Sequence, residues 1–388
     1  MFEREEPMRV VGLFAGIGGL ELGLSRAGHE TTLLCEIAPA ARIVLDARFP
    51  DICKHDDIAE LDALPGDTEI VAAGFPCQDL SQAGLTQGIG GERSGLVSEV
   101  FRLIDDQNTP LVLLENVSFM LQLDRGRAIA TLVDAFESRG YRWAYRVINS
   151  LSFLPQRRER VYFIASRCDI DPAAVLFADD VTPPLPETDL DTHAHGFYWT
   201  EGVRGLGWAP DAVPTLKNGS TIGIPSPPAV LLPSGDVIKP DIRDAERLQG
   251  FPEDWTIAAN ANGRTSRRWA LVGNAVTVPV AEWVGARIAC HTAYHTDRDR
   301  AGAWKSWPRA ARGSRSGRVR VEVGGYPAFV PREPLHNFLR HSGEPLSARA
   351  TRGFLRRTDA GNLRFRAGFR ERVRRHLEVM ERAGIAAE

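Results

Sequence analysis

Short apolar segments alternate with amphipathic segments through the first 165 residues, and this alternation constrains the fold more than any other feature of the chain. The apolar segments have the length of strands, and the amphipathic segments have the length of helices. Strands are predicted at residues 10–14, 32–36, 69–73, 111–115, 142–149 and 160–165, and helices at 19–27, 39–47, 96–107 and 125–139. The pattern predicts an α/β fold with a doubly wound, mostly parallel sheet. Ligands of such sheets bind at the carboxyl ends of the strands.

The 388 residues divide by local composition into four regions. Residues 8–167 form the first part of the α/β domain, residues 168–241 are rich in proline and glycine, and residues 242–292 return to a helical texture. The dense turn residues predict a small loop-rich region between the two α/β parts. Residues 293–388 form a C-terminal extension. It opens with AARGSRSGR, whose composition predicts mobility, and ends with GFRERVRRHLEVMERAG, which predicts a basic amphipathic helix.

Charge is divided unevenly along the chain. Residues 296–388 hold 21 Lys and Arg against 10 Asp and Glu, whereas residues 1–295 hold 26 against 40. A basic extension on an acidic body favours contact with a polyanion such as nucleic acid. The alternative interpretation is a solvated, arginine-rich helical face.

Composition excludes several classes of protein. The five cysteines are an odd number with no C-x-x-C spacing, which argues against both a disulfide framework and a zinc site, and we expect no metal. The sequence contains no run of about 18 apolar residues, so no membrane span is expected. The N-terminus MFEREEPMRV lacks the apolar core of a secretion signal. A cytosolic protein is expected.

The first predicted strand leads into the glycine-rich segment FAGIGGLELGL. Gly16, Gly18 and Gly19 allow a tight turn and a close approach of the backbone to a ligand. Glu36 ends the second strand, 20 residues after Gly16, where an acid can accept hydrogen bonds from ribose hydroxyls. Asp57 follows the next presumed strand and can hold an exocyclic amine. Because the pattern is not G-x-G-x-x-G, a mononucleoside cofactor of the adenosine type is favoured over a dinucleotide.

The segment GFPCQDLS places Cys77 at the exit of the strand 69–73. Pro76 restricts the turn and Gly74 permits close approach, so the loop can present the thiol as a nucleophile. A buried, inert cysteine is the alternative. The segment LVLLENV adds a carboxyl, Glu115, at the end of another apolar strand, where desolvation should raise its pKa towards that of a general acid.

A third polar group follows in LPQRRERVYFIA. Gln156, Arg158 and Arg160 alternate along the start of a strand and therefore share one face. Two guanidinium groups and an amide on that face can bind a base carbonyl and phosphates. Surface salt bridges are the alternative role for the two arginines.

Taken together and in order, these segments resemble the motifs of the DNA (cytosine-5) methyltransferase family. FAGIGG resembles the donor-binding loop, GFPCQDLS the catalytic loop, and ENV and QRRERVYFI the next two catalytic blocks. RDAERLQGFP and GNAVTVPVAEWVG resemble the two closing blocks. The resemblance covers residue 8 to about 290, and it leaves the C-terminal extension unexplained.

The resemblance implies transfer of a methyl group from S-adenosylmethionine to a cytosine that is flipped out of duplex DNA. It implies that the Cys77 thiolate attacks carbon 6, that Glu115 assists at N3, and that Arg160 binds the cytosine O2, supported by Gln156 and Arg158. The donor site would consist of residues in the glycine loop and at the strand ends, namely Phe14, Ala15, Gly16, Gly18, Gly19, Glu36, Ile37, Asp57, Ile58, Gly74, Pro76, Asn274 and Ala275. Two positions depart from the usual pattern, because Ile37 stands where an aromatic residue is frequent and Ala275 where serine is common.

The resemblance also assigns sequence recognition to the segment from about 168 to 240, which is short for the family. VPTLKNGST looks like the landmark of that region, so Thr215 is expected at a backbone phosphate. Lys217, Asn218 and Ser220 are further candidate DNA contacts, and Ser81 belongs to the loop that closes over the DNA. A proline-rich structural loop is the alternative for each of them.

The expected partner is double-stranded DNA, in a bacterial cytoplasm and near the nucleoid. A restriction or defence system is one context for such a mark, and a monomer is expected. Two alternatives stay open at this point. One is the same chemistry on tRNA, and the other is a DNA-binding regulator without catalysis, against which the presence of Cys77, Glu115 and Arg160 argues.

Overall fold

A computed structural model describes the chain except residues 1, 4–5, 76–94, 219–226, 261–265 and 386–388. The described residues form two compact units, each assembled from separate stretches of sequence. Unit 1 contains residues 1–152, 159–182 and 275–329, and unit 2 contains residues 153–158, 183–274 and 330–388. None of the described helices has both the length and the apolar character needed to cross a membrane.

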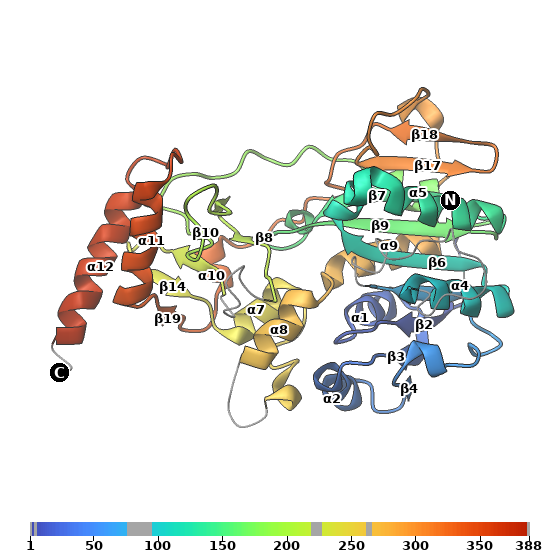
Figure 1. Ribbon diagram of the computed structural model, residues 1–388, viewed down its shortest axis with the longest axis horizontal. Helices are drawn as coiled ribbons and strands as arrows, with labels where there is room; N and C mark the ends of the chain where they lie inside the picture. Colours follow the sequence, from blue (N-terminus) through green and yellow to red (C-terminus); the bar gives the residue numbers. More distant parts are fainter. Residues whose placement is uncertain (1, 4–5, 76–94, 219–226, 261–265, 386–388) are drawn as a thin grey trace. The chain divides into compact units, whose positions relative to one another are not determined.

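Unit 1 is built on a ten-stranded sheet with the order β16-β18-β17-β7-β9-β6-β5-β2-β3-β4 (Figure 1). The strands that follow the sequence prediction are β2 (Arg9–Leu13), β3 (Glu30–Cys35), β5 (Ile70–Ala73), β6 (Leu111–Val117), β7 (Arg142–Asn149) and β9 (Glu159–Ser166). The edge strand β4 (Cys53–His55) is the strand that was presumed before Asp57 without bounds, because its three residues are too few and too polar to form an apolar run. Strands β4, β3, β2, β5 and β6 are parallel. Strand β9 runs antiparallel between β6 and β7.

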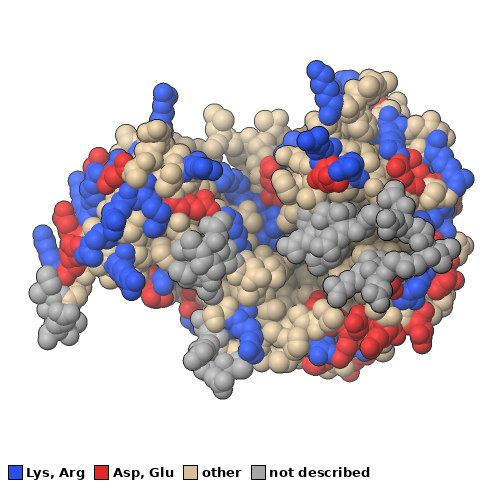
Figure 2. All heavy atoms as spheres, in the orientation of Figure 1, with Lys and Arg blue, Asp and Glu red and all other residues tan. Residues whose placement is uncertain are grey.

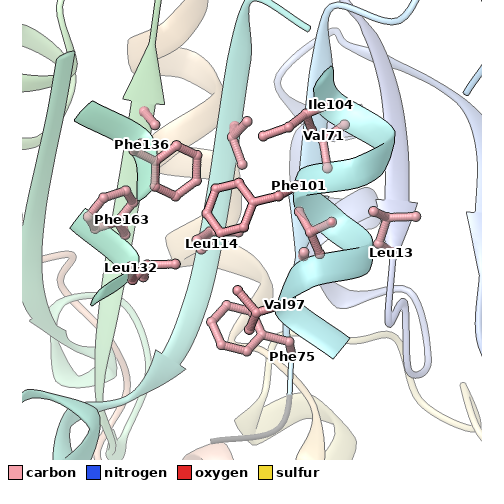
Figure 3. Packing of buried hydrophobic residues seen from close by; sticks show 14 of the residues in the cluster. Leu13, Val71, Phe75, Val97, Phe101, Ile104, Leu114, Leu132, Phe136 and Phe163 are labelled. Atoms are coloured by element: carbon pink, nitrogen blue, oxygen red, sulfur yellow. The ribbon is translucent and has the colours of Figure 1, made fainter. Parts of the chain in front are cut away.

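Helices cover both faces of this sheet. The helices of unit 1 are α1 (Gly19–Arg26), α2 (Pro39–Arg48), α4 (Leu96–Asp106), α5 (Arg127–Ser138), α6 (Pro172–Phe177) and α9 (Val278–Ala289). Residues of α4 and α5 pack on one face of the sheet in the largest apolar cluster, which Figure 3 shows around Phe101, Phe136 and Leu114. Burial of these side chains supplies the main stabilisation of unit 1 and fixes the strands whose ends carry the site.

Helices α1 and α9 pack against each other at two glycines. A Cβ atom at Gly23 would lie 2.5 Å from the Cβ of Ala281, and one at Gly285 would lie 2.7 Å from the Cβ of Ala27. The two helices therefore approach more closely than any larger residue would allow. Helix α9 returns the chain to unit 1 and secures the helix that follows the glycine loop. Beyond α9, β15 (Cys290–His291) pairs with β1 (Phe2–Glu3).

The first part of the C-terminal extension enlarges the sheet of unit 1. Strands β17 (Ala310–Ser314) and β18 (Gly317–Val321) form a hairpin, β17 pairs with β7, and β16 (Asp299–Arg300) pairs with β18. The prediction that AARGSRSGR is mobile is therefore wrong. Its small residues serve packing instead, since Ala310 and Ala311 are buried and a Cβ at Gly313 would lie 2.7 Å from Trp143.

Unit 2 contains a five-stranded antiparallel sheet with the order β11-β10-β13-β14-β19. The strands are β10 (His195–Phe197), β11 (Ala209–Pro210), β13 (Ala229–Leu231), β14 (Val237–Lys239) and β19 (Glu344–Pro345). A separate parallel pair joins β8 (Gln156–Arg157) to β12 (Val213–Pro214). The helices are α7 (Ile242–Leu248), α8 (Ser266–Asn274), α10 (Leu335–Phe338), α11 (Ala348–Ala360) and α12 (Phe369–Ile385). Helix α12 confirms the predicted basic helix at the C-terminus.

The units divide the chain differently from the predicted regions 168–241, 242–292 and 293–388. Residues 168–182 belong to unit 1, helices α7 and α8 group with residues 183–241 in unit 2, and α9 groups with unit 1. The extension is divided at residue 329 between the two units. Local composition and periodicity distinguish helical from loop-rich segments, but they do not indicate which sheet a later strand will join.

Candidate active site

Most of the predicted site residues of unit 1 lie at one edge of its sheet. Because β2, β3, β4, β5 and β6 are parallel, their carboxyl ends meet at that edge. The glycine loop follows β2, Glu36 follows β3, Asp57 comes shortly after β4, and Gly74 follows β5. Glu115 lies near the end of β6, and Arg160 lies at the start of the antiparallel β9, so both belong to the same edge.

The glycine loop has the backbone conformation that its sequence requires. Gly16 and Gly18 have φ values of 57° and 82°, and Phe14 adopts φ 54° although it is not glycine. A Cβ at Gly16 would meet no heavy atom within 4 Å, so the space beside this residue is open. At Gly18, by contrast, a side chain would collide with the ring of Phe49. Ala15 is buried, and Gly19 begins α1 directly after the loop.

Glu36 fastens the glycine loop to the end of β3. Its Oε2 accepts a hydrogen bond of 2.7 Å from the backbone N–H of Gly16, and its Oε1 accepts one of 2.7 Å from the N–H of Ala38. Each carboxylate oxygen keeps further acceptor capacity after one such bond. The carboxylate is therefore held in place and can still accept hydroxyl groups of a ligand.

The residues around Glu36 fit an adenosine-type donor. Ile37 exposes 64% of its surface, which leaves an apolar face available to a planar base. Asp57 accepts a hydrogen bond of 2.9 Å from the N–H of Ala59 with one oxygen, at the start of the short helix η1 (Ile58–Glu60), while Ile58 is buried below it. The open space at Gly16 and the two carboxylates give this edge the shape and polarity that a nucleoside with hydroxyl and amine groups requires.

Glu115 and Arg160 form an ion pair at this edge of the sheet. Nε of Arg160 lies 3.2 Å from Oε1 of Glu115, and the two side chains are 15% and 9% exposed. Nη1 of Arg160 donates to the carbonyl of Glu159 at 2.8 Å. This pairing places a carboxyl and a guanidinium side by side in a largely water-free position, where electrostatic interactions are stronger than in water.

Asn116 is a site residue to which the sequence assigned no role. Its Nδ2 donates a hydrogen bond of 3.0 Å to the carbonyl of Phe75, and its Oδ1 accepts from the N–H of Val117 at 2.8 Å. Gly74 precedes Phe75, and a Cβ there would lie 3.8 Å from Oε2 of Glu115. Asn116 therefore fixes the start of the GFPCQDLS segment beside Glu115. An amide within an apolar run was the signal that sequence reasoning passed over.

Gln156 and Arg158, whose alternation with Arg160 predicts a shared face, belong to unit 2, whereas Arg160 belongs to unit 1. Both are almost completely buried. The side chain of Gln156 bonds to Leu248, Gln249 and Leu216, and Nη1 of Arg158 donates to the carbonyls of Leu216 and Gly273. These polar groups connect residues 156–158 to residue 216 and to helices α7 and α8, and their predicted role at a substrate stays a prediction.

The predicted DNA contacts of unit 2 lie just beyond β12. The hydroxyl of Thr215 donates to the carbonyl of Arg157 at 2.8 Å, so its single proton is already used. Nζ of Lys217 lies 3.0 Å from Glu201 and 3.7 Å from the ring centre of Tyr198, and Asn218 is exposed. Gly273 permits this arrangement, because a Cβ there would collide with the backbone of Lys217 and Asn218. Asn274 ends α8 in unit 2, and Ala275 begins the return to unit 1.

Several predicted residues lie outside the described part of the chain, namely Pro76, Cys77, Ser81 and Ser220. The four described cysteines are unbonded, and burial raises the pKa of the Cys35 thiol to about 12, so Cys35 is a poor nucleophile. No group of three or more potential metal ligands occurs among the described residues.

The sheet order and the site together define the class of protein. From β4 to β7 the strands of the sheet are parallel, except that β9 is reversed between β6 and β7. This arrangement, with a glycine loop after β2 and an acid after β3, is the fold of class I S-adenosylmethionine-dependent methyltransferases. A solved structure, the Dnmt2 methyltransferase of S. pombe, shares this fold with a TM-score of 0.52 and 18% sequence identity, covering 71% of this chain and 96% of that chain.

Sequence comparison establishes the family. A family model described as "C-5 cytosine-specific DNA methylase" matches residues 8–195 and 239–290, and the chain belongs to this family. The chain is 46% identical over 363 residues to the Type II methyltransferase M2.BsuMI of Bacillus subtilis (strain 168), covering 90% of this chain and 93% of the relative. It is 29% identical to the Type II methyltransferase M.Bsp6I of Bacillus sp. (strain RFL6), covering 72% of this chain and 98% of the relative.

Proposed function

We propose that the protein transfers a methyl group from S-adenosylmethionine to carbon 5 of cytosine in duplex DNA, at a short specific sequence. The observation that carries this proposal is the buried Glu115–Arg160 ion pair, 3.2 Å across, beside the strand end that leads through Gly74 and Phe75 to Cys77. Family membership supplies the reaction class, and the ion pair supplies the groups that the cytosine ring requires.

The nucleophilic step falls to Cys77. Carbons 5 and 6 of cytosine are stacked inside a duplex, so the base has to be flipped out before a thiolate can reach carbon 6. Attack by the Cys77 sulfur forms the S–C6 bond and moves an electron pair towards N3. Glu115 stabilises N3 by donating a proton or hydrogen bond, and Arg160 binds O2 with the guanidinium nitrogens that Glu115 and Glu159 leave free.

Carbon 5 becomes nucleophilic in this adduct. S-adenosylmethionine would supply the methyl group that carbon 5 takes up, and its sulfur would keep the electron pair of the broken S–CH3 bond, so that S-adenosylhomocysteine is released. A base then removes the proton from carbon 5, the electron pair restores the C5–C6 double bond, and the Cys77 thiolate leaves. A proton that Glu115 gave to N3 returns to the carboxylate as the neutral cytosine ring is restored, so the protein ends the cycle with the thiol and carboxyl groups with which it began.

The donor is assigned to the glycine loop and the neighbouring strand ends. Glu36 would accept the ribose hydroxyls, since each of its oxygens makes only one backbone hydrogen bond of 2.7 Å. Asp57 would hold the exocyclic amine with its second oxygen, and Ile37 would lie against the base. The backbone at Gly16 and Gly18 would approach the amino-acid part of the donor. Asn274 and Ala275 complete the assignment from the closing motif.

The names of the relatives support a proposal for the cellular role. Two of them are named Type II methyltransferases and come from bacteria, so we place the mark in a restriction–modification system and the protein in the bacterial cytoplasm with its DNA. A monomer suffices for action on one flipped base.

The experiment is base-resolution 5-methylcytosine sequencing of genomic DNA from cells that express the wild type, Cys77→Ala or Cys53→Ala. Cys53 is an exposed free thiol of unit 1 and serves as the matched control. We expect methylation at one short sequence with the wild type and with Cys53→Ala, and none with Cys77→Ala. Methylation that survives in Cys77→Ala would refute the covalent mechanism. Methylated tRNA together with unmodified DNA would refute the assignment of duplex DNA as substrate.

A further inference from the structure

Residues 330–388 share an apolar core with the recognition region of unit 2. Phe354 of α11 and Phe369 of α12 pack on Phe197 of β10, with ring centres 5.0 and 5.2 Å apart. Leu346 and Val373 are buried in the same cluster. The apolar faces of both helices therefore pack against the five-stranded sheet of unit 2.

Hydrogen bonds reinforce this packing. Nδ1 of His376, a buried residue of α12, accepts from the N–H of Val237 in β14 at 3.2 Å, and its Nε2 lies 2.9 Å from the carbonyl of Leu346. With Nδ1 accepting, Nε2 carries the proton and donates. Strand β19 also pairs with β14. The last 59 residues are thus an integral part of the unit to which sequence recognition is assigned, and not an appended domain.

The outer faces of the two helices are strongly basic. Residues 348–385 contain eleven arginines, no lysine and four acidic residues. Figure 2 shows Lys and Arg side chains gathered over α11 and α12. Arginine is the side chain best suited to phosphate, because its planar fork of donors can make two parallel hydrogen bonds.

Internal ion pairs account for only some of these arginines. Asp359 pairs with Arg370 and Arg374, and Asp191 pairs with Arg372. Nη2 of Arg352 lies 2.6 Å from Glu381.

One row of arginines remains directed to solvent. Arg349, Arg352 and Arg356 are exposed at the spacing that places them on one side of α11, which we call the arginine stripe. The Arg352–Glu381 pair brings the stripe beside exposed Arg382 of α12. Within the described residues, Arg349, Arg356 and Arg382 make no ion pair with an acidic side chain.

The stripe belongs to a helix that is fastened to the candidate DNA contacts. Arg357, the next residue of α11, donates from Nη2 to the carbonyl of Trp199 at 2.6 Å and from Nε to the carbonyl of Glu201 at 3.1 Å. The side chain of Glu201 in turn pairs with Lys217 at 3.0 Å. Exposed Arg204 lies in the same loop. Within unit 2, basic side chains therefore extend from the segment VPTLKNGST, which contains Lys217, to helix α11.

We propose that the arginine stripe, together with Arg382, binds backbone phosphates of the duplex outside the methylated sequence. This inference rests on the proposed function, since it takes duplex DNA as the substrate. Phosphate contacts add affinity and orientation but carry no sequence information directly. The extension would therefore lengthen the DNA contact of a recognition region that is short for its family.

The test compares two variants with equal loss of charge. The first carries Arg349→Gln, Arg356→Gln and Arg382→Gln. The control carries Arg300→Gln, Lys305→Gln and Arg320→Gln, which are exposed residues of the unit 1 part of the extension. Glutamine keeps a long side chain with good helix propensity, so both variants should fold. Binding to a duplex with the target sequence and to one without it is measured from about 50 to 300 mM salt, with kcat at saturating duplex.

We expect the first variant to reduce the slope of log K against log salt by about 2 to 3, close to 0.9 for each lost phosphate contact. The ratio of affinities for target and non-target duplexes, and kcat at saturation, should stay at the wild-type values. The control variant should keep the wild-type slope.

An unchanged slope in the first variant, while the wild type methylates duplex DNA, would overturn this inference alone. Equal losses in both variants would also overturn it, because they would indicate a diffuse effect of net charge. A wild type that does not methylate duplex DNA would overturn the proposed function and this inference with it.

Discussion

At the scale of single residues, Glu115 combines burial with an ion pair to Arg160. Replacing it by glutamine keeps its size but removes the proton that would reach N3 of the cytosine. We expect Glu115→Gln to lower kcat by about 10²- to 10⁴-fold, the usual contribution of a general acid, with unchanged donor affinity because the donor residues lie at other strand ends. Single-turnover methylation and adduct formation on a duplex containing 5-fluorocytosine would measure it. Glu60→Gln, an exposed change in unit 1, is the control, and equal rates in both variants would contradict the assigned role.

Glu21 provides a second prediction at this scale. Its side chain is 1% exposed and packs on Gly12, and burial raises the pKa of its carboxyl to about 8. Between the ordinary pKa and that value, the folded chain holds a proton that the unfolded chain releases. The free energy of unfolding therefore falls as pH rises, by about 1.4 kcal/mol per pH unit, until the folded carboxyl ionises near pH 8.

Glu21→Gln should remove this dependence. We expect the variant to be more stable than the wild type at pH 8 and to differ less at pH 5, because the neutral amide has no proton to lose. Thermal unfolding from pH 5 to 8.5 would measure the difference. Parallel curves for variant and wild type would show that Glu21 ionises at its ordinary pKa.

At the scale of elements, the sequence located most strands and helices of unit 1 because each one carries its own pattern. The apolar run of β7 was predicted over its full range, Arg142–Asn149, and α5 differs from its prediction by one or two residues at each end. The local sequence pattern gave a wrong prediction where the secondary structure of a segment depends on the elements that it packs against. Gly313 and its neighbours form a strand that pairs with the edge of β7 and packs on the ring of Trp143, and neither partner is visible in the local sequence.

The same limit applies to the site. Glu36 and Glu115 were predictable, because each follows an apolar strand whose end lies at the ligand edge. Alternation also grouped Gln156 and Arg158 with Arg160, and this grouping stays a prediction, because the chain passes from unit 2 to unit 1 between residues 158 and 159. A period of two residues describes which face of a strand a side chain occupies, but it contains no information about where one unit ends.

The hairpin of β17 and β18 yields a prediction at the scale of elements. Gly313→Ala would place a Cβ 2.7 Å from the side chain of Trp143 and 3.0 Å from that of Arg318. We expect the free energy of unfolding to fall by about 1–3 kcal/mol, as overpacking usually produces. Gly66→Ala is the matched control, since a Cβ there meets no heavy atom within 4 Å. Melting temperatures measure both, and equal values for the two variants would contradict the packing of this hairpin on Trp143.

At the scale of the whole molecule, the extension contributes to both units rather than forming a third. Its first part adds three strands to the sheet of unit 1, and its second part supplies Phe354, Phe369 and Val373 to the core of unit 2. The match to the Bacillus subtilis relative covers 90% of this chain and so must include part of these residues, whereas the family model ends at residue 290. Residues 293–388 share a basic composition but have two separate structural roles, one in the sheet of unit 1 and one in the core of unit 2.

A chain that ends at Phe329 tests this division. It keeps unit 1 complete but removes the side chains that cover Phe197 and Leu231 in unit 2. We expect backbone amides of β10 and β13 to lose protection from hydrogen exchange, because their apolar cover is gone, whereas amides of β2, β5 and β6 stay protected. Donor binding, which is assigned to unit 1, should persist while DNA binding is lost. A chain ending at Ala383 is the control and should match the full protein. If β10 and β13 stay protected in the shorter chain, residues 330–388 are dispensable for unit 2, and the recognition region folds without them.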